Sequence, residues 1–170
     1  MSETLEPALP DRLDKQAERL MHRLCDRKLT VATAESCTGG MLAALLTDIE
    51  GAGRGFDRGF VTYTKEAKAE LLGIEPSLLE HNDAVSEVVA RAMAEGALKR
   101  SKADIALGVT GFAGPAGPGN EEGLVHVAVA RRNGRTLHSE QHFGPVGRGA
   151  IRVESLNVLL DLLEQSLEEE

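Results

Sequence analysis

The sequence predicts an α/β protein, a three-layer α/β/α sandwich built on a mixed, mostly parallel five-stranded sheet. Stretches with helical spacing alternate with apolar, strand-like stretches over roughly the first two thirds of the chain, and this alternation is typical of parallel strands joined by helices. Residues 104–110 form a nearly continuous apolar run, as expected of a strand that is covered on both faces. Asn133-Gly134 then indicates a tight hairpin, which adds an antiparallel strand.

The first half of the chain supplies two of these strands. Leu13, Ala17, Leu20 and Leu24 recur at helical spacing and predict an amphipathic first helix. A short apolar stretch before a Gly-Gly pair predicts a strand that turns into a second helix. The elements expected here are helices at 11–27, 39–48, 65–72 and 76–79, and strands at 29–34 and 56–63.

The second half begins with Ser86, a favourable N-cap for a long helix. Leucines at spacings of three and four predict a final helix from about Arg148. The expected elements are helices at 86–100 and from 148 onward, and strands at 104–110, 124–131 and 136–143. We expect one domain over residues 11–168, with residues 1–10 as a frayed lead-in.

Composition limits the classes of partner. The formal net charge of −8 argues against a general nucleic-acid-binding protein, because neutralising phosphates requires clustered lysines and arginines. Two cysteines do not make a disulfide framework, and no apolar run reaches the ~20 residues that span a bilayer. The first ten residues lack the basic and apolar regions of a signal peptide. We therefore expect a cytoplasmic protein without a membrane or nucleic-acid partner.

The segment Glu35–Gly40 is the first candidate site. It reads Glu-Ser-Cys-Thr-Gly-Gly between a predicted strand and a predicted helix. Glycines let the backbone approach a ligand closely, and the free N–H groups at a helix start suit a phosphate or a developing oxyanion. The alternative is structural: Thr38 caps the helix and the glycines only permit the turn.

Metal and thiol chemistry have less support. Cys37 reads as a small buried side chain rather than a nucleophile. No two histidines have the spacing of metal ligands on a helix, and His138 and His142 would lie about 13 Å apart on a strand, as surface residues. We expect no metal and no cofactor.

Six motifs follow one another along the chain: Thr33–Gly40, Arg58–Tyr63, Ala67–Gly73, Ala84–Glu87, Val109–Pro115 and Gly123–Val127. In this order they resemble the C-terminal domain of CinA, the family of nicotinamide-nucleotide amidohydrolases. Together they cover the chain from about Leu13 to Leu163. The resemblance implies hydrolysis of the carboxamide of nicotinamide mononucleotide (NMN) to nicotinate mononucleotide and ammonia. Many relatives carry a further N-terminal domain, and this chain resembles the stand-alone form.

The resemblance also implies an active site made of Ser36, Tyr63 and Lys68. Lys68 would deprotonate a serine, and Tyr63 would orient Lys68 or relay its proton. A lysine with its free pKa of ~10.4 is a poor base, so burial or a neighbouring cation must lower that pKa. Lys65, where the family usually has Asn, is expected to be exposed.

Several residues are candidates to bind the nucleotide. A phosphate would lie at the helix start or at the end of the central strand, where ligands gather in open α/β sheets. Arg152, in the place of a family arginine, would face it, with Arg148 as the nearby rival. Glu35 would contact a ribose hydroxyl or support Lys68. The predicted binding set is Glu35, Thr38, Gly39, Gly40, Thr110, Gly111, Gly114 and Arg152.

One departure from the family leaves the function open. The loop that commonly reads Gly-Ser-Ser is Gly51-Ala52-Gly53 here. If the second loop serine is the nucleophile, the chain either binds NMN without cleaving it, or uses Ser36 or an activated water. The alternatives are therefore a catalytically silent nucleotide-binding homologue that acts as a sensor or partner module, and a serine amidase of another small substrate.

We also expect a homo-oligomer, most simply a dimer. The last helix carries a leucine stripe, and the helix at 86–100 has a face of small residues. Together they offer more apolar surface than one thin sandwich is expected to cover.

Overall fold

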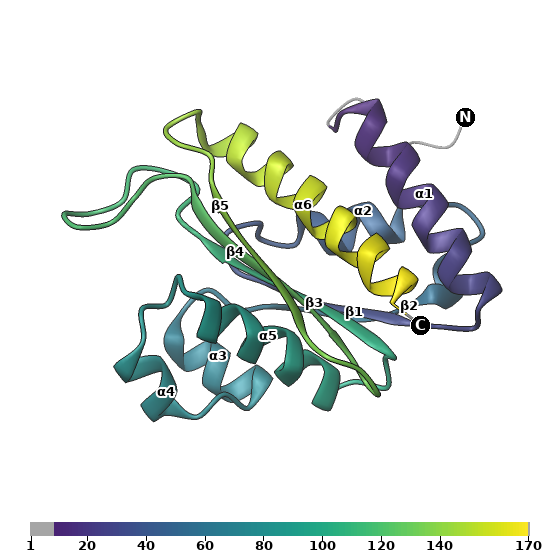
Figure 1. Cartoon of the computed structure of the whole chain (residues 1–170), viewed down its shortest axis with the longest axis horizontal. Coiled ribbons are helices and arrows are strands. Elements are labelled where there is room, and N and C mark those ends of the chain that lie inside the picture. The colour runs from purple at the N-terminus through teal and green to yellow at the C-terminus, as the bar shows by residue number, and fades with distance from the viewer. Residues whose placement is uncertain (1–8, 170) are drawn as a thin grey trace.

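In the computed structural model, which describes residues 9–169, five strands form one mixed sheet in the order β2-β1-β3-β4-β5 (Figure 1). The three strands on the β2 side run parallel, and β4 and β5 each run antiparallel to the preceding strand. The predicted mixed five-stranded sheet is confirmed. The strands are β1 (Val31–Glu35), β2 (Phe56–Val61), β3 (Ile105–Gly111), β4 (Leu124–Arg131) and β5 (Leu137–His142).

Helices cover both faces of the sheet and complete the predicted sandwich (Figure 1). Most of the expected lead-in, residues 1–8, lies outside the described residues. On one face lie α1 (Asp11–Asp26), α2 (Met41–Thr47) and α6 (Arg148–Glu168). On the other lie α3 (Lys65–Leu72), α4 (Pro76–His81) and α5 (Glu87–Lys99). A short 3-10 turn, η1 (Gly53–Gly55), precedes β2.

The second helix starts later than predicted. It begins at Met41 because Gly39 and Gly40 have φ angles of 57° and 99°, a left-handed conformation that cannot belong to a right-handed helix. The glycine pair thus forms a turn that places the preceding residues at the end of β1. The predicted strand to Tyr63 likewise ends earlier, at Val61.

The two faces of the sheet have cores of different character. The face under α1, α2 and α6 is built largely from leucines and valines, whereas the face under α5 is rich in alanine. A Cβ atom at Gly108 would lie 2.8 Å from the Ala90 carbonyl oxygen, so glycine lets α5 approach β3 closely.

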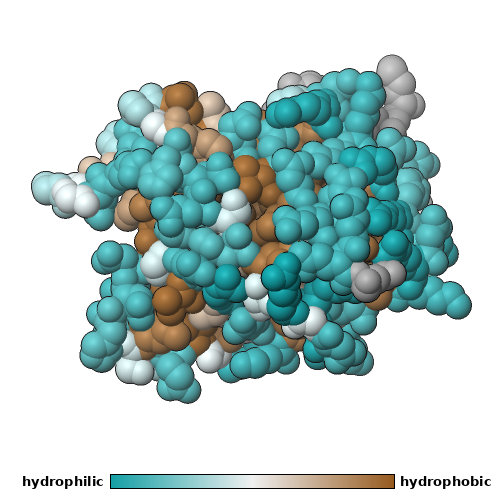
Figure 2. Space-filling model, viewed as in Figure 1, coloured by the Kyte–Doolittle hydropathy of each residue, from teal (hydrophilic) through white to brown (hydrophobic). Residues whose placement is uncertain are grey.

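The apolar faces that suggested a dimer are covered within the chain itself. Val89, Met93 and Ala97 of α5 and the leucines of α6 belong to the two cores. Hydrophilic side chains predominate on the face seen in Figure 2, with smaller hydrophobic patches between them. The homo-oligomer stays a prediction that these faces no longer support. No helix within residues 9–169 is long and apolar enough to cross a membrane.

The register of the sheet shows which groups lie at each end of the parallel strands. Val31 pairs with Phe56 and Glu35 pairs with Val61, so Ser36 and η1 lie at opposite ends of the paired strands. Five residues of strand span about 16 Å. The carboxyl ends of the parallel strands form one edge of the molecule, where the start of α3, the β3–β4 loop and the start of α6 meet, and the β4–β5 turn lies at the opposite edge (Figure 1). Ser36 directly follows β1 and lies at the first edge, whereas η1 directly precedes β2 and lies at the second.

Candidate active site

A serine and a lysine meet at the carboxyl end of β1. The Lys68 Nζ lies 3.1 Å from the Ser36 Oγ. Thr64 caps α3 by accepting a hydrogen bond from the Ala67 N–H, and the buried side chains of α3 are Lys68 and Leu72. These two positions are four residues apart and share one helix face, so α3 directs Lys68 inward. The predicted pairing of Ser36 with Lys68 is present.

Lys68 is buried without a counter-ion. Its side chain is 1% exposed, and Nζ also donates to the carbonyl oxygens of Thr62 and Tyr63, at 2.8 and 3.3 Å. No carboxylate within residues 9–169 lies in ion-pair distance of it. Burial therefore lowers the Lys68 pKa from its usual value, opposed by the nearby Cys37. A lowered pKa makes the neutral amine, the form that accepts a proton, more available.

Tyr63 takes part through its backbone rather than its ring. Its carbonyl oxygen accepts from Lys68, but the residue is 73% exposed. No hydrogen bond joins the phenol hydroxyl to any of residues 9–169. Tyr63 was expected to orient Lys68 or relay its proton. Its contact with Lys68 is made by the backbone carbonyl, and a role of the hydroxyl stays a prediction.

Glu35 has a structural role that the sequence did not reveal. Its fully buried carboxylate accepts from the Thr38 hydroxyl at 2.6 Å and from the backbone N–H groups of Leu42 and Ala43, at 2.8 and 3.1 Å. A carboxylate at a helix N-terminus is electrostatically favourable. Glu35 thus does not pair with Lys68, and its contact with a ribose stays a prediction. It also occupies N–H groups of α2 that a phosphate was expected to use.

Other backbone donors of the turn remain available. The N–H groups of Cys37, Thr38 and Gly40 donate no hydrogen bond to another of residues 9–169. Ser36 itself donates its N–H to the Val109 carbonyl at 3.1 Å, which fixes the residue against β3. Amide groups next to a nucleophile are suited to stabilise an oxyanion.

The Cys37 thiol is not the nucleophile of this turn. It is buried, and burial raises its pKa to about 11. A thiol with so high a pKa carries almost no thiolate at neutral pH. The expected structural role of Cys37 agrees with this burial.

Two arginines from α6 reach the same edge. Arg152 donates through Nε to the Cys37 carbonyl at 2.8 Å, and a Cβ at Gly39 would lie 2.7 Å from its Nη2. A Cβ at Gly114 would collide with the Arg148 guanidinium. Arg148 and Arg152 are four residues apart on α6 and share a face. The sequence analysis gave Arg152 and Arg148 as alternative candidates to bind the phosphate, whereas the structure brings both to the edge of the molecule that carries Ser36.

Thr110 and Gly111 serve mainly to build this edge. The Thr110 hydroxyl donates to the Ala84 carbonyl at 2.8 Å and ties down the loop before α5. A Cβ at Gly111 would lie 2.7 Å from the Val125 Cγ2, so glycine permits the pairing of β3 with β4. Both were predicted to bind substrate, and the contacts described for them are internal.

The loop that lacks the family serines lies at the other edge. Ala52 is fully buried against the core under α1, and the Cys25 thiol donates to its carbonyl. Gly53 opens η1, before the start of β2. The register places it across the sheet from Ser36, so a side chain at Gly53 cannot reach a substrate at the Ser36–Lys68 pair of its own chain.

A histidine pair was missed by the sequence analysis. The rings of His126 and His138 stack at 5.2 Å between centroids, and His126 Nδ1 lies 3.0 Å from His138 Nε2. The His138 side chain is only 10% exposed, so the expectation of a surface residue is wrong. Alternate residues of neighbouring strands share a face, and a twelve-residue separation gave no signal of this contact. No group of three metal-ligating side chains occurs within residues 9–169.

Residues 13–167 match the family described as the CinA C-terminal domain. The chain belongs to this family. It is 46% identical over 158 residues to a "Putative competence-damage inducible protein" from Acetivibrio thermocellus, covering 91% of this chain and 37% of that protein. It is 47% identical over 158 residues to a "CinA-like protein" from Mycobacterium marinum, covering 91% and 36%. The chain thus spans about a third of the length of these relatives.

Solved CinA structures share the fold over nearly their full length. The competence/damage inducible protein CihA from Agrobacterium tumefaciens superposes with a TM-score of 0.90 at 42% identity, covering 97% of this chain and 98% of that one. A CinA superfamily protein from Escherichia coli gives a TM-score of 0.85 at 32% identity, covering 97% and 99%. The names of these CinA proteins state no reaction.

Proposed function

We propose that this CinA-family chain is an amidohydrolase that converts NMN to nicotinate mononucleotide and ammonia. The observation that carries the proposal is Lys68, buried without a counter-ion 3.1 Å from the Ser36 hydroxyl. Hydrolysis of an amide without a metal needs a nucleophile, a base and an oxyanion site. Ser36, Lys68 and the N–H groups of the turn after Ser36 supply these three elements in the proposal.

The first half of the reaction forms an acyl-enzyme. Neutral Lys68 takes the proton of Ser36 as Oγ attacks the carboxamide carbon, and the carbonyl oxygen becomes an oxyanion. The N–H groups of Thr38 and Gly40, which donate no hydrogen bond to another of residues 9–169, stabilise this charge. The C–N bond then breaks, Lys68 returns the proton to the leaving nitrogen, and ammonia departs. The nicotinoyl group remains as an ester on Ser36.

The second half releases the acid. Lys68 takes a proton from a water molecule, the resulting hydroxide attacks the ester carbon, and a second oxyanion forms at the same amides. The ester bond breaks, Ser36 regains the proton from Lys68, and nicotinate mononucleotide leaves. One water is consumed for each ammonia released, and the protein returns to its starting state.

The two arginines of α6 support a phosphorylated substrate. Arg152 is held over the turn by the Cys37 carbonyl, and Arg148 lies one helical turn away, over Gly114. Guanidinium groups bind phosphate through charge-assisted hydrogen bonds. Nicotinamide riboside, which lacks the phosphate, should bind more weakly than NMN.

The test is ammonia release from NMN. Lys68→Met should abolish it, whereas Lys65→Met, a change of the same type on the exposed side of α3, should leave it unchanged. Free nicotinamide measured alongside NMN separates this activity from that of another small-substrate amidase. If Lys68→Met and Lys65→Met release ammonia at the same rate, the proposed chemistry is wrong.

A second candidate follows from the loop sequence. With Gly51-Ala52-Gly53 where relatives of the family carry serines, the chain could be a silent NMN-binding homologue that acts as a sensor or partner module. Calorimetry that detects NMN binding while wild-type protein releases no ammonia would select this function. η1 lies across the sheet from Ser36, so the loss of the loop serines removes no group from the Ser36–Lys68 pair. This position favours a catalytically active protein over a silent homologue.

A further inference from the structure

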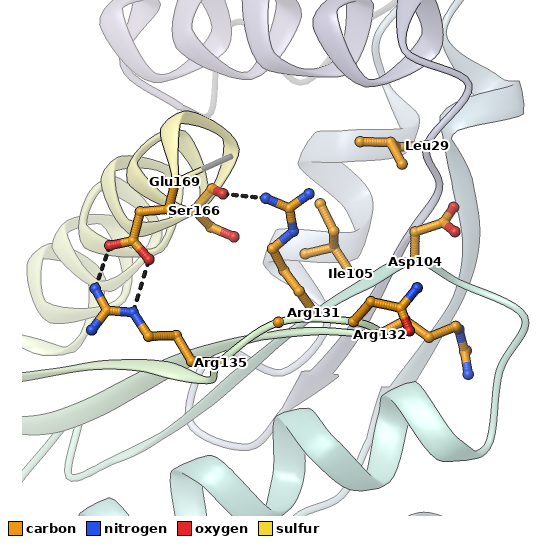
Figure 3. Close-up of a pocket in the computed structure, with 10 residues that line it drawn as sticks. Leu29, Asp104, Ile105, Arg131, Arg132, Arg135, Ser166 and Glu169 are labelled. Carbon is orange, nitrogen blue, oxygen red and sulfur yellow. Dashed lines mark hydrogen bonds and ion pairs between the residues drawn. The ribbon is translucent and has the colours of Figure 1, made fainter.

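A cavity of about 630 Å³ lies at the edge of the sheet opposite the Ser36–Lys68 pair (Figure 3). The β4–β5 turn, the start of β3 and the end of α6 enclose it, and Leu29 and Ile105 give it an apolar side. Pockets for small ligands typically have volumes of about 300–1,000 Å³. The cavity shares no residue with the candidate active site.

Arg131 places a partly unused guanidinium in this cavity. Its Nη1 donates to the Ser166 carbonyl at 2.6 Å. No hydrogen bond joins its other guanidinium nitrogens to any of residues 9–169. Figure 3 shows the group extending from β4 into the space between α6 and Leu29. Arginine presents its donors as a fork, so a second acceptor can bind without breaking the first contact.

Ser166 provides an independent sign of a ligand. The residue is 1% exposed, and its Oγ is buried with no hydrogen-bond partner in the described part of the chain. In Figure 3 the Ser166 oxygens face Arg131. Buried hydroxyls are nearly always hydrogen-bonded, and each exception needs an explanation. A ligand oxygen beside Arg131 would supply the missing partner.

The charges around the cavity select an anion. The chain carries a net charge of −8, yet three arginines lie within five positions, at 131, 132 and 135. Arg132 is committed to the end of α5, because it donates to the carbonyls of Leu98, Ser101 and Ala103. Of the other two, Arg131 has guanidinium nitrogens without a hydrogen-bond partner among residues 9–169, and Arg135 is paired with Glu169.

The acidic groups of the cavity already have partners. The Asp104 carboxylate accepts from the N–H and hydroxyl of Thr30, at 2.9 and 3.1 Å. Glu169 accepts two hydrogen bonds from Arg135, at 2.9 and 2.5 Å (Figure 3). Glu169 thus occupies one anion position and would compete with an entering anion for Arg135.

We propose that this cavity binds a phosphate monoester that carries a flat apolar body, the chemistry of a nucleoside monophosphate. The phosphate oxygens accept from Arg131 and from the Ser166 hydroxyl, and they displace Glu169 from Arg135. Leu29, which is half-buried, contacts the ring. This second site is separate from the proposed reaction and stands whether or not the chain hydrolyses NMN.

Calorimetry with AMP and with inorganic phosphate tests the proposal at low salt. The 170-residue chain with Arg148→Ala and Arg152→Ala serves as the parent, so that the other edge cannot hold the phosphate. AMP should bind at one site, and inorganic phosphate should bind more weakly because it lacks the ring. Arg131→Gln should weaken AMP binding about tenfold or more, and Ser166→Ala should weaken it by a smaller factor.

The residue that competes with the anion gives a gain-of-affinity test. Glu169→Gln should tighten AMP binding several-fold, because it frees Arg135. Glu168→Gln removes the same charge from the neighbouring exposed position and should have a much smaller effect. If Arg131→Gln fails to fold, the comparison of Glu169→Gln with Glu168→Gln decides. The proposal is overturned if AMP gives no binding, or if these two glutamate variants bind AMP equally.

Discussion

Replacing Lys68 by methionine should separate catalysis from stability. Methionine fills similar space, but it lacks the ammonium that donates to Ser36, Thr62 and Tyr63. Loss of a general base typically reduces a rate by about 10²–10⁴-fold, which corresponds to about 3–5 kcal/mol of activation free energy. We therefore expect ammonia release to fall by at least about 100-fold.

The free energy of unfolding should change much less at neutral pH. The variant leaves two backbone carbonyls without a donor, at about 1–3 kcal/mol each if they stay dry. It also removes a buried ammonium, and each unit by which burial lowers the Lys68 pKa corresponds to about 1.4 kcal/mol of instability. Because these contributions oppose each other, the free energy of unfolding, measured by urea denaturation, should change by less than the activation free energy does.

The pH dependence provides an internal check. Because the folded pKa of Lys68 lies below its unfolded value, the unfolded chain binds more protons between the two. Wild type should therefore gain stability relative to Lys68→Met as pH rises toward about 10.4. The reasoning fails if the variant retains a tenth of the activity, or if the stability difference between the two proteins is the same at every pH.

Three further predictions follow from other contacts. Glu35→Gln should lower the free energy of unfolding by about 1–3 kcal/mol in urea denaturation, because the α2 N-terminus loses its carboxylate. An unchanged midpoint of urea denaturation in Glu35→Gln would contradict this prediction. Arg152→Ala should weaken NMN binding about tenfold or more in calorimetry, while the affinity for nicotinamide riboside stays the same; equal losses for both ligands would contradict a phosphate contact. Burial lowers the pKa values of His126 and His138, so the unfolded chain protonates first and the melting temperature should fall as pH drops below about 6.5. A His126→Gln, His138→Gln double variant should lose that part of the pH dependence, and an unchanged slope would contradict the assignment.

Local patterns were enough to predict the fold. The helix at 65–72 occurs with the predicted ends, because Thr64 caps it and Gly73 ends it in the left-handed conformation. The hairpin at Asn133-Gly134 and the buried strand at 104–110 follow from equally local signals. Elements whose ends are set by turn chemistry and periodicity can be found without tertiary information.

The candidate site was only partly predictable. Ser36 and Lys68 were paired through the family resemblance, since a separation of 32 residues gives no physical signal of contact. The roles of Glu35 and Tyr63 depended on which way each side chain points at the end of its strand, and periodicity does not determine that at a terminus. Likewise, the position of Gly53 at the far edge requires the register of β2 on β1.

The most direct test of the account is to compare ammonia release from NMN by wild type and by Ser36→Ala, with calorimetry of NMN binding to both. The account predicts robust release by wild type, essentially none by Ser36→Ala, and similar NMN affinities for the two proteins. Ammonia release that persists in Ser36→Ala, or a wild type that binds NMN without releasing ammonia, would contradict it.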